Sequence, residues 1–397
     1  MSAEWRSTTI GDFCHFTYGK GLPAEKRRPG DFPVVSSAGI TGSHDEPLVN
    51  TKGIVIGRKG TVGSLTYCDG PFWAIDTAFY IADEPNRRDL RYTYYLLKTL
   101  GLESMNSDSA VPGLNRENAH SIEVKVPSLE LQNKIASQLS ALDVKIAVNQ
   151  RINSTLEAIA RTLFKSWFVD FDPVRSKLDG KSPIFLDEAT AKLFPHDFQE
   201  SGLGYIPKGW RAGTLSEEFN ITMGQSPPGN TYNELGDGLP FYQGCTDFGF
   251  RFPKRRIYCS EPNRMAKDRD ALVSVRAPVG NINMANEECC IGRGVAAVRH
   301  KSGASSFTYY AIANLYPDFA KFEGEGTVFG SINKDSFEKL PFVIPPIEIV
   351  TEFERIAKPL DEQIRILVEQ SHTLASIRNT LLPKLLNGEV DIENLHP

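Results

Sequence analysis

The sequence lacks several patterns that would assign it directly to a class of protein. It contains no run of 18 apolar residues, and its opening, MSAEWRSTTI, has neither the basic nor the apolar segment of a secretory signal. We therefore expect no membrane contact and a cytoplasmic location. Six cysteines occur without a C-x-x-C pair and seven histidines without an H-x-x-x-H pair, so no metal site is predicted. The cysteines are interpreted mainly as reduced core residues.

Catalytic motifs are also missing. There is no G-x-x-x-x-G-K-[ST] phosphate loop, no glycine pattern for a dinucleotide, and no histidine in a motif with a nucleophile. Ser226-Pro227-Pro228-Gly229 is similar to the tetrapeptide of amino-methyltransferases, but Gly229 replaces the aromatic residue that would stack on a flipped base. The chain is therefore predicted to bind rather than to catalyse.

The two halves of the sequence resemble each other, which indicates an internal duplication. The offset is 205 residues between Trp5 and Trp210, 217 between the β-rich runs at 53–64 and 270–281, and 218 from Asn115 and Asn333 onward. Other matched pairs are Tyr94-Tyr95 with Tyr309-Tyr310 and Leu142-Asp143 with Leu360-Asp361. Chance would not keep one register for so long.

Two stretches of about 40 residues carry apolar residues in the heptad pattern of long helices. The apolar columns begin at Ile135 and Leu139 in the first stretch, and at Phe353 and Ala357 in the second. Each helix needs a partner for its apolar side, and the other copy is the obvious one. Asn149 and Asn153 interrupt the first seam. They indicate either buried polar residues that fix the register or a frayed, solvated segment.

The expected fold is α+β, with two pseudo-repeated α/β modules separated by an antiparallel pair of long coiled-coil helices. The segments are a first module at 1–127, a helix at 128–168, a connector at 169–204, a second module at 205–345, and a helix with a tail at 346–397. The modules are β-rich, with Gly and Pro turns. The Pro, Gly and charged residues of the connector predict an extended segment with little core of its own.

The helices and the connector carry the motifs of a known family. These are PGLNRENAHSIEVKVPSLELQNKIASQLSALDVKI at 112–146, NQRINSTLEAIARTLFKSWFVDFDPV at 149–174 and LGYIPKGW at 203–210. With them the chain resembles the specificity subunits of type I restriction-modification systems over its whole length. The resemblance is specific in the helices and looser in the modules. It implies that the modules are target recognition domains, that each reads one half of a split DNA site, and that the helices are spacers.

The resemblance also implies partners. These are double-stranded DNA, two DNA adenine methyltransferase subunits docked on this chain, and motor-nuclease subunits that join them for cleavage. The chain itself is expected to be non-catalytic and to bind no cofactor, with S-adenosylmethionine and ATP with Mg²⁺ on the partner subunits. Two diverged copies of one module are expected to recognise an asymmetric bipartite sequence, because contacts to base edges carry the sequence information.

Candidate DNA contacts are the residues of Gly-rich, polar or basic loops, because such loops approach DNA closely. In the first module they are Tyr18, Lys20, Ser36, Ser37, Arg58, Lys59, Thr61 and Arg116. In the second they are Gln225, Ser226, Tyr242, Gln243, Arg276, Asn333 and Lys334. The alternative for each is a solvated charge or a turn residue. The triplets Lys26-Arg27-Arg28 and Lys254-Arg255-Arg256 indicate either phosphate contacts or solvated surface.

The charge balance sets a limit on DNA affinity. The net charge of the chain is −5, but residues 1–128 carry 14 basic and 15 acidic residues, and residues 205–345 carry 16 and 15. The modules are therefore neutral, not acidic. Neutral modules neutralise few phosphates, so tight DNA binding is expected only when methyltransferase subunits enclose the DNA.

Aromatic and leucine residues near the helix ends suggest a surface on which partner proteins dock. The candidates are Phe164, Trp167, Phe168 and Phe171 of the first copy, and Leu382 and Leu385 of the second. The alternative is that these side chains cap the core of the helical pair.

Two other classes of function stay open at this point. A stand-alone enzyme is disfavoured by the missing motifs, and a scaffold that binds only proteins is disfavoured by the paired Gly- and Arg-rich loops. Loss of one bipartite adenine-methylation motif after deletion of the gene would distinguish the DNA-reading subunit from both.

Overall fold

The structure is a computed structural model that describes residues 5–105, 113–183, 186–324, 330–390 and 392. Pro112, which opens the first family motif, lies outside them. The chain divides into two compact units, Met1–Val148 with Gln370–Pro397, and Asn149–Glu369. Each unit therefore contains one module and a part of each long helix.

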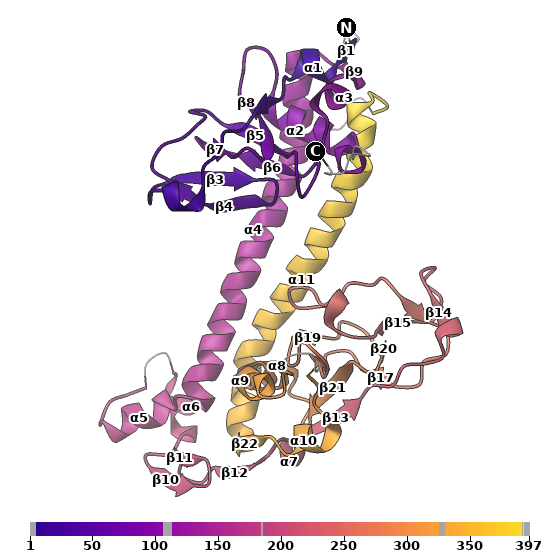
Figure 1. Cartoon of the computed structure of the whole chain (residues 1–397). Coiled ribbons are helices and arrows are strands. Elements are labelled where there is room, and N and C mark those ends of the chain that lie inside the picture. Colours follow the sequence, from indigo (N-terminus) through magenta and orange to yellow (C-terminus); the bar gives the residue numbers. More distant parts are fainter. Residues whose placement is uncertain (1–4, 106–112, 184–185, 325–329, 391, 393–397) are drawn as a thin grey trace. The chain divides into compact units, whose positions relative to one another are not determined.

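The first module is built from three small sheets (Figure 1). An antiparallel pair joins β1 (Arg6–Thr9) to β9 (Glu123–Val126). A four-stranded sheet has the order β2 (Thr17–Tyr18), β8 (Ala78–Ala82), β5 (Gly53–Gly57), β6 (Leu65–Cys68). A three-stranded sheet has the order β4 (Gly39–His44), β3 (Phe32–Ser36), β7 (Trp73–Ala74), in which β3 and β7 are parallel.

Helices complete the first unit. They are α1 (Ile10–Phe13), α2 (Leu90–Thr99), α3 (Arg116–His120), the first part of α4 (Leu129–Phe168), and 3₁₀ turns at Ala24–Lys26 and Leu102–Ser104. Helix α2 begins where the Asp89 carboxylate accepts a hydrogen bond from the Tyr92 N–H at 2.6 Å. Strand residues such as Ile54 and Phe79 pack with Tyr92 and with Leu139 of α4 in one core.

The second module repeats this plan. β12 (Arg211–Thr214) pairs with β22 (Pro341–Ile344). A four-stranded sheet has the order β13 (Phe219–Met223), β21 (Val295–His300), β18 (Ala271–Ser274), β19 (Ile282–Met284). The other sheet has the order β14 (Tyr232–Asn233), β16 (Tyr258–Cys259), β15 (Leu239–Tyr242), β20 (Cys289–Ile291), β17 (Met265–Ala266). As β3 and β7 do, β15 and β20 run parallel. The duplication seen in the sequence is therefore a duplication of strand order.

Helices complete the second module as well. The short ones are α7 (Leu215–Glu218), α8 (Ser305–Asn314), α9 (Tyr316–Ala320), α10 (Lys334–Glu338), and 3₁₀ turns at Gly229–Thr231 and Cys245–Asp247. Asn115 caps α3 and Asn333 caps α10, each with its side-chain oxygen on backbone N–H groups of the first turn. The repeated asparagines thus mark equivalent helix starts.

The two long helices were predicted at 128–168 and from 346 onward, and the structure contains α4 (Leu129–Phe168) and α11 (Ile347–Leu386). In the second unit the end of α4 meets the start of α11, where the Phe164 and Phe353 rings lie 5.6 Å apart. In the first unit the start of α4 meets the end of α11, where Arg378 binds Asp143. The helices are therefore antiparallel, as predicted, and Asn149 and Asn153 are buried.

The prediction of an extended connector was wrong. Residues 169–204 contain α5 (Asp172–Leu178), α6 (Glu188–Leu193) and β10 (Phe198–Ser201), which pairs with β11 (Gly204–Pro207). The core of the second unit includes Phe171, Val174 and Phe194. Apolar residues spaced between polar and turn residues therefore anchor this segment, which a composition argument does not detect.

The docking prediction for the aromatic residues also needs correction. Phe164, Trp167, Phe168 and Phe171 are 2 to 9% exposed and belong to the core of the second unit. Leu385 is 1% exposed, and Leu382 packs against the core of the first unit. These side chains have their partners within the chain, so they form no open surface, and the alternative that they cap the helical pair holds.

Among the described helices, none has the length and the apolar character needed to cross a membrane. Within the same ranges no group of three or more His, Cys, Asp or Glu side chains is arranged to hold a metal ion.

Candidate nucleic-acid interface

In the first module, three of the predicted DNA-contact residues form one stack. The Tyr18 ring lies 5.0 Å from the guanidinium carbon of Arg58 and 5.0 Å from that of Arg116. These distances are typical of cation–π contacts. Tyr18 remains 47% exposed, so the stack presents an aromatic ring and two forked cations to the solvent.

The backbone of this site is held by strand ends and one close approach. Gly19 follows β2, and a Cβ atom at this position would lie 2.1 Å from the Ile75 carbonyl oxygen. The next N–H, that of Lys20, donates to the Ala74 carbonyl at 2.9 Å. The Leu114 N–H donates to the Arg58 carbonyl at 2.8 Å, which brings the start of α3 and its Arg116 to the end of β5. Residues far apart in sequence thus converge because several strands end together.

The second module builds the same backbone arrangement. Gly224 follows β13, and a Cβ atom there would lie 2.2 Å from the Gly292 carbonyl oxygen. The Gln225 N–H donates to the Ile291 carbonyl at 3.0 Å, and the Ile332 N–H donates to the Val275 carbonyl at 3.0 Å. These bonds match those made by Lys20 and Leu114 in the first module.

The side chains of the second site are different. The Gln243 Nε2 donates to the Ser226 Oγ at 2.9 Å, and the same Oγ accepts the Arg293 N–H at 3.3 Å. Gln225, Arg276 and Lys334 are exposed. This surface therefore offers amide, hydroxyl and cationic groups without an exposed aromatic ring stacked between arginines.

Equivalent positions follow from these matched hydrogen bonds and from the offsets of 205, 217 and 218 residues. The pairs that keep a positive charge are Lys59 with Arg276 and Arg116 with Lys334. The pairs that change character are Tyr18 with Met223, Lys20 with Gln225, Arg58 with Val275, and Asp76 with Arg293. The two modules thus share a frame and a part of their charge, while most of the surface chemistry differs.

Three predicted contact residues are buried, so their predicted role is wrong in this structure. Tyr242 is 1% exposed and packs between the sheets with Leu272 and Ile291. Ser36 and Ser37 are 8 and 7% exposed. The Ser36 Oγ accepts the Ala38 N–H, and the Ser37 carbonyl accepts the Ser64 hydroxyl, so both serines shape a turn. The remaining candidate in this loop region, Thr61, is exposed.

Half of the cations in the basic triplets pair with carboxylates within the chain. Arg28 binds Asp45 and Glu46, and the Arg27 guanidinium donates to the Thr41 carbonyl at 2.9 Å. In the second module Arg255 binds Glu287, and Arg256 binds Asp247. Carboxylates pair with three of these six cations, so Arg28, Arg255 and Arg256 are weaker candidates for phosphate contacts than Lys59 and Arg276.

Trp73, Asp76 and Arg293 were not among the DNA-contact residues predicted from the sequence. The Trp73 indole N–H donates to the Lys20 carbonyl at 2.8 Å, and the Lys20 ammonium lies 6.0 Å from the Trp73 ring centroid. The Arg58 guanidinium donates to the Asp76 carbonyl at 3.3 Å. The offset of 217 that matched Val62-Gly63 with Val279-Gly280 also matches Asp76 with Arg293, so extending the repeat by this offset would have found both.

Two titratable groups lie beside the first site. A hydrogen bond from Arg116 lowers the pKa of Glu117 below its ordinary value. Burial, followed by the nearby charge of His15, lowers the pKa of His120. The His120 Nε2 accepts the Phe16 N–H at 3.0 Å, which requires this nitrogen to be unprotonated. The geometry and the lowered pKa agree that His120 is neutral near pH 7.

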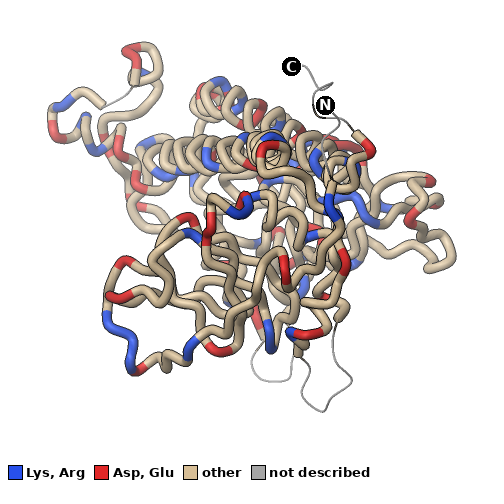
Figure 2. The backbone as a smooth tube through the Cα atoms, turned by 90° about the horizontal axis from the view of Figure 1, so that it is seen from above, with Lys and Arg blue, Asp and Glu red and all other residues tan. Residues whose placement is uncertain are grey.

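Figure 2 shows Lys and Arg positions interspersed with Asp and Glu positions along the chain. This pattern agrees with the neutral balance of each module. Local groups of a few residues, rather than an extended basic face, therefore have to carry any DNA recognition.

Comparisons with known proteins match the whole arrangement. The family described as type I restriction modification DNA specificity domain matches residues 2–158 and again residues 207–376. The chain is 29% identical over 321 residues to a Methanocaldococcus jannaschii chain assigned as the MjaX specificity subunit of a type I restriction enzyme, covering 78% of this chain and 70% of that one. It is 28% identical over 329 residues to the HindI specificity subunit of Haemophilus influenzae, covering 70% and 71%.

A solved structure supports the fold. The crystal structure of a type I restriction-modification system S subunit from M. genitalium superposes with a TM-score of 0.63 at 18% identity, covering 97% of this chain and 96% of that chain. The two family matches together span more than half of the sequence, each over one module and a following part of a long helix. The chain therefore belongs to the family of type I restriction-modification DNA specificity subunits, with one specificity domain in each half.

Proposed function

We propose that each module of this specificity subunit reads one half of an asymmetric bipartite DNA site. The observation that supports this most directly is the paired geometry of the loops. In both modules, strand ends, a close glycine contact and the start of a short helix bring the same set of positions together. Two sites with one frame and different side chains are suited to two different base sequences.

Within each site we assign the two constant cations to the phosphates. Lys59 and Arg276 occupy equivalent positions, as do Arg116 and Lys334. Phosphates are the same in every sequence, so a residue that only binds phosphate has no reason to differ between the modules. Lys59 and Arg276 are exposed, which leaves their charge available to DNA.

The changing positions are assigned to base recognition. Arg58 offers the fork that matches guanine O6 and N7, while Gln225 and Gln243 offer amides that match adenine N6 and N7. Tyr18 offers a ring for stacking or for contact with a thymine methyl group. The two half-sites are therefore expected to differ in base preference, and the site as a whole to be asymmetric.

The helices and the partners belong to the same proposal. We assign α4 and α11 the role of a spacer that sets the gap between the half-sites and docks two DNA adenine methyltransferase subunits. Motor-nuclease subunits would join them for cleavage. The chain itself is non-catalytic and acts in the cytoplasm. Because the modules are neutral, the isolated chain binds DNA weakly, and the methyltransferase subunits supply the rest of the binding free energy.

Methylome sequencing of the host tests this function directly. A strain with the gene intact should carry adenine methylation at one bipartite motif, and a strain with the gene deleted should lose methylation at that motif alone. An unchanged methylome would contradict the proposal. Restoring the gene with Arg58→Ala should alter the sequence accepted in one half of the motif and leave the other half as it was.

A further inference from the structure

Arg251 is fully buried in the second unit, with 0% of its side chain exposed. It follows the 3₁₀ turn Cys245–Asp247, on the segment that leads from β15 to β16. A charged side chain in such a place is stable only when other groups satisfy it. The groups that contact Arg251 therefore have to stabilise its buried charge.

The partners of Arg251 come from the long helix and from α8. Its Nη1 donates to the Asp361 Oδ1 of α11 at 2.8 Å, and its Nη2 donates to the Tyr310 hydroxyl of α8 at 2.9 Å. The same Tyr310 hydroxyl donates to the Asp361 Oδ1 at 2.9 Å, which closes a triangle. The guanidinium carbon lies 3.8 Å from the Tyr309 ring centroid, and Glu157 of α4 lies 3.9 Å from Nη2.

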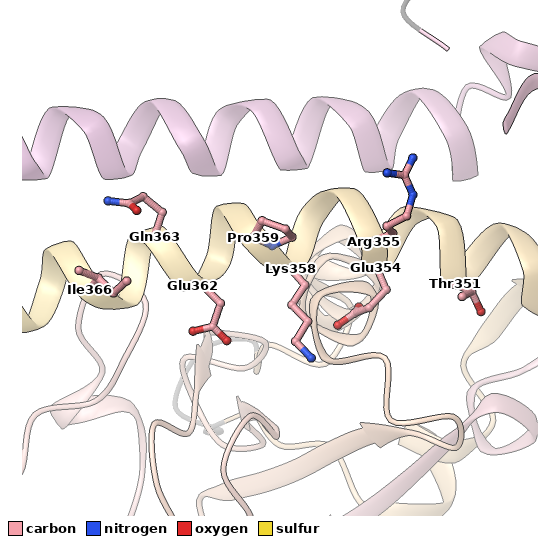
Figure 3. Close-up of a pocket in the computed structure, with 8 residues that line it drawn as sticks. All are labelled: Thr351, Glu354, Arg355, Lys358, Pro359, Glu362, Gln363 and Ile366. Atoms are coloured by element: carbon pink, nitrogen blue, oxygen red, sulfur yellow. The ribbon is translucent and has the colours of Figure 1, made fainter. Parts of the chain in front are cut away.

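Other polar contacts lie on the same side of α11. Both Glu354 carboxylate oxygens accept backbone N–H groups at the start of α8, from Ser305, Ser306 and Phe307. Glu362 binds Arg269. Figure 3 shows Glu354, Lys358 and Glu362 pointing from α11 toward the loops of the module, while Arg355 and Gln363 point toward α4. These residues belong to a stripe on α11 that lines a shallow hollow.

Apolar packing alone would hold the module less specifically. Phe353 of α11 packs against Phe307 of the module and Phe164 of α4. Such contacts supply most of the binding free energy but have little directional preference. The Arg251 triangle requires defined angles between its donors and acceptors. It therefore distinguishes one position of the module on α11 from neighbouring positions of similar apolar burial.

The segment of Arg251 also connects directly to the DNA-contact candidates. Gln243, which directly follows β15, is eight residues before Arg251. The Arg251 carbonyl accepts the Met284 N–H at 2.8 Å, and the Gly249 carbonyl accepts the Asn283 side-chain amide at 3.0 Å. The segment is thus fixed to β19 as well as to α11, so it transmits the position of the helix to the loop that carries Gln243.

In the described part of the first unit, no arginine of the module bonds to the equivalent aspartate, Asp143. There the Tyr95 hydroxyl donates to the Asp143 Oδ2 at 2.6 Å. The cation that pairs with Asp143 is Arg378 of α11, with side chains 23% and 28% exposed, so it joins the two helices rather than the module to a helix. The repeat position of Arg378 in the second unit is Ala160. Arg251 is therefore particular to the second module.

We propose that Arg251 is a positioning residue that fixes the second recognition module on α11, and that it thereby restricts the spacer length accepted between the half-sites. This inference rests on the proposed function. It concerns the residue that holds the module, and it adds to the spacer role assigned to the helices themselves.

The test removes the whole polar triangle without leaving an unpaired buried group. The variant is Arg251→Met with Asp361→Leu and Tyr310→Phe, because apolar replacement of a complete buried network preserves stability better than loss of one partner. It is expressed with the full methyltransferase in a strain deleted for the gene, and methylation is mapped. Ser376→Ala, an exposed change on the same helix outside this stripe, is the matched control.

We expect the triple variant to keep both half-site sequences and to methylate sites whose spacer is one base pair longer or shorter. The share of methylated sites with such a longer or shorter spacer should rise about tenfold over wild type. This corresponds to a loss of about 1.4 kcal/mol in the discrimination between spacer lengths. The control should keep the wild-type spacer. A triple variant that methylates with the wild-type spacer would overturn the inference. If it fails to accumulate, Tyr310→Phe alone should show a smaller rise in the same share, and no rise would overturn the inference equally.

Different results would contradict the proposed function and the role of Arg251. If deletion of the gene leaves the methylome unchanged, the function is wrong. If the wild-type chain directs one bipartite motif and the variants retain its spacer, only the role of Arg251 is wrong.

Discussion

The two recognition modules use one backbone frame to present different surfaces. In the first, Tyr18 lies between the guanidinium groups of Arg58 and Arg116. In the second, the corresponding region presents the Gln243 amide bonded to Ser226. Both modules contain an antiparallel pair, a four-stranded sheet and matching hydrogen bonds at the strand ends, while the remaining sheet has three strands in the first module and five in the second. Under the proposed function, the shared backbone would set the positions of the DNA contacts, and the few side chains that differ would set the bases that they recognise.

The modules also differ in how they are attached to the long helices. The Asp361 side chain of α11 is 2% exposed and binds Arg251, a cation of the second module. Asp143 is 28% exposed and binds a cation from the other helix. Removal of one partner should cost much more stability in the buried pair of Arg251 and Asp361 than in the partly exposed pair of Arg378 and Asp143.

The largest expected effect is on stability in the second unit. Asp361→Ala leaves the Arg251 charge buried without its main partner and should destabilise this unit by about 3–5 kcal/mol. Asp143→Ala should destabilise the first unit by only about 1–2 kcal/mol, because the Arg378 side chain is 23% exposed and water can solvate the cation that is left. Hydrogen exchange followed by mass spectrometry would report each unit separately. Equal losses in the two units would refute the contrast between the attachments.

The next effect concerns recognition by the first module. Arg58→Ala should weaken binding of the assembled methyltransferase to its site by about 1–3 kcal/mol and relax base preference in one half-site. Fluorescence anisotropy with a panel of single-base changes would measure both. Lys98→Ala, an exposed cation of α2 outside the stack, serves as the control. If Arg58→Ala weakened all sequences alike, Arg58 would belong with the phosphate contacts.

The constant cations should behave alike in both modules. Lys59→Ala and Arg276→Ala should each lower affinity by a similar factor for every sequence and reduce the slope of log affinity against log salt by about 1. Anisotropy titrations at several salt concentrations give this slope. A sequence-dependent loss in either variant would break the division between constant and changing positions.

The smallest effect concerns pH at the hydrogen bond between the Phe16 N–H and His120, whose equivalent position in the second module is Glu338. Burial lowers the pKa of His120 in the folded state. The unfolded chain therefore takes up the proton more readily, and this contribution to stability is present above pH 6.5 and is lost as the pH falls below it. The protection factor of the Phe16 amide, which is its intrinsic exchange rate divided by its observed rate, should fall on acidification. His120→Gln, which keeps an acceptor, should flatten this response, and an unchanged response would exclude His120 as its source.

Much of the fold could be predicted from the sequence because repeated residues report on repeated geometry. The heptad pattern predicted the bounds of α4 and α11 within a few residues, because an apolar stripe with this period is typical of a long helix packed against a partner. The repeats of Tyr94-Tyr95 and Leu142-Asp143 were visible, but their contact was not. The hydrogen bond from Tyr95 to Asp143 depends on how α2 packs on α4, and linear sequence carries no signal for that packing.

The site was predicted in part for similar reasons. Tyr18, Arg58 and Arg116 lie together at strand ends, and their contact with DNA stays a prediction. Tyr242 was misplaced because its strand neighbours do not show which face is covered by a second layer. The aromatic group near Trp167 has the same composition whether it forms an interface or a core. Arg251 gave no signal at all, because a single arginine after a turn is usually solvated.

The capping of α8 has a consequence for transplanting recognition modules between chains. Helix α2 is capped by Asp89 from its own module, whereas the cap position of α8 is Ala304 and its N–H groups are satisfied by Glu354 of α11. A graft of residues 205–345 would leave α8 with exposed donors in a host helix that lacks this glutamate. The portable form of the second module therefore includes α11 as far as Asp361, which also keeps the partner of Arg251, and the border of the exchangeable unit lies inside the helix rather than before it.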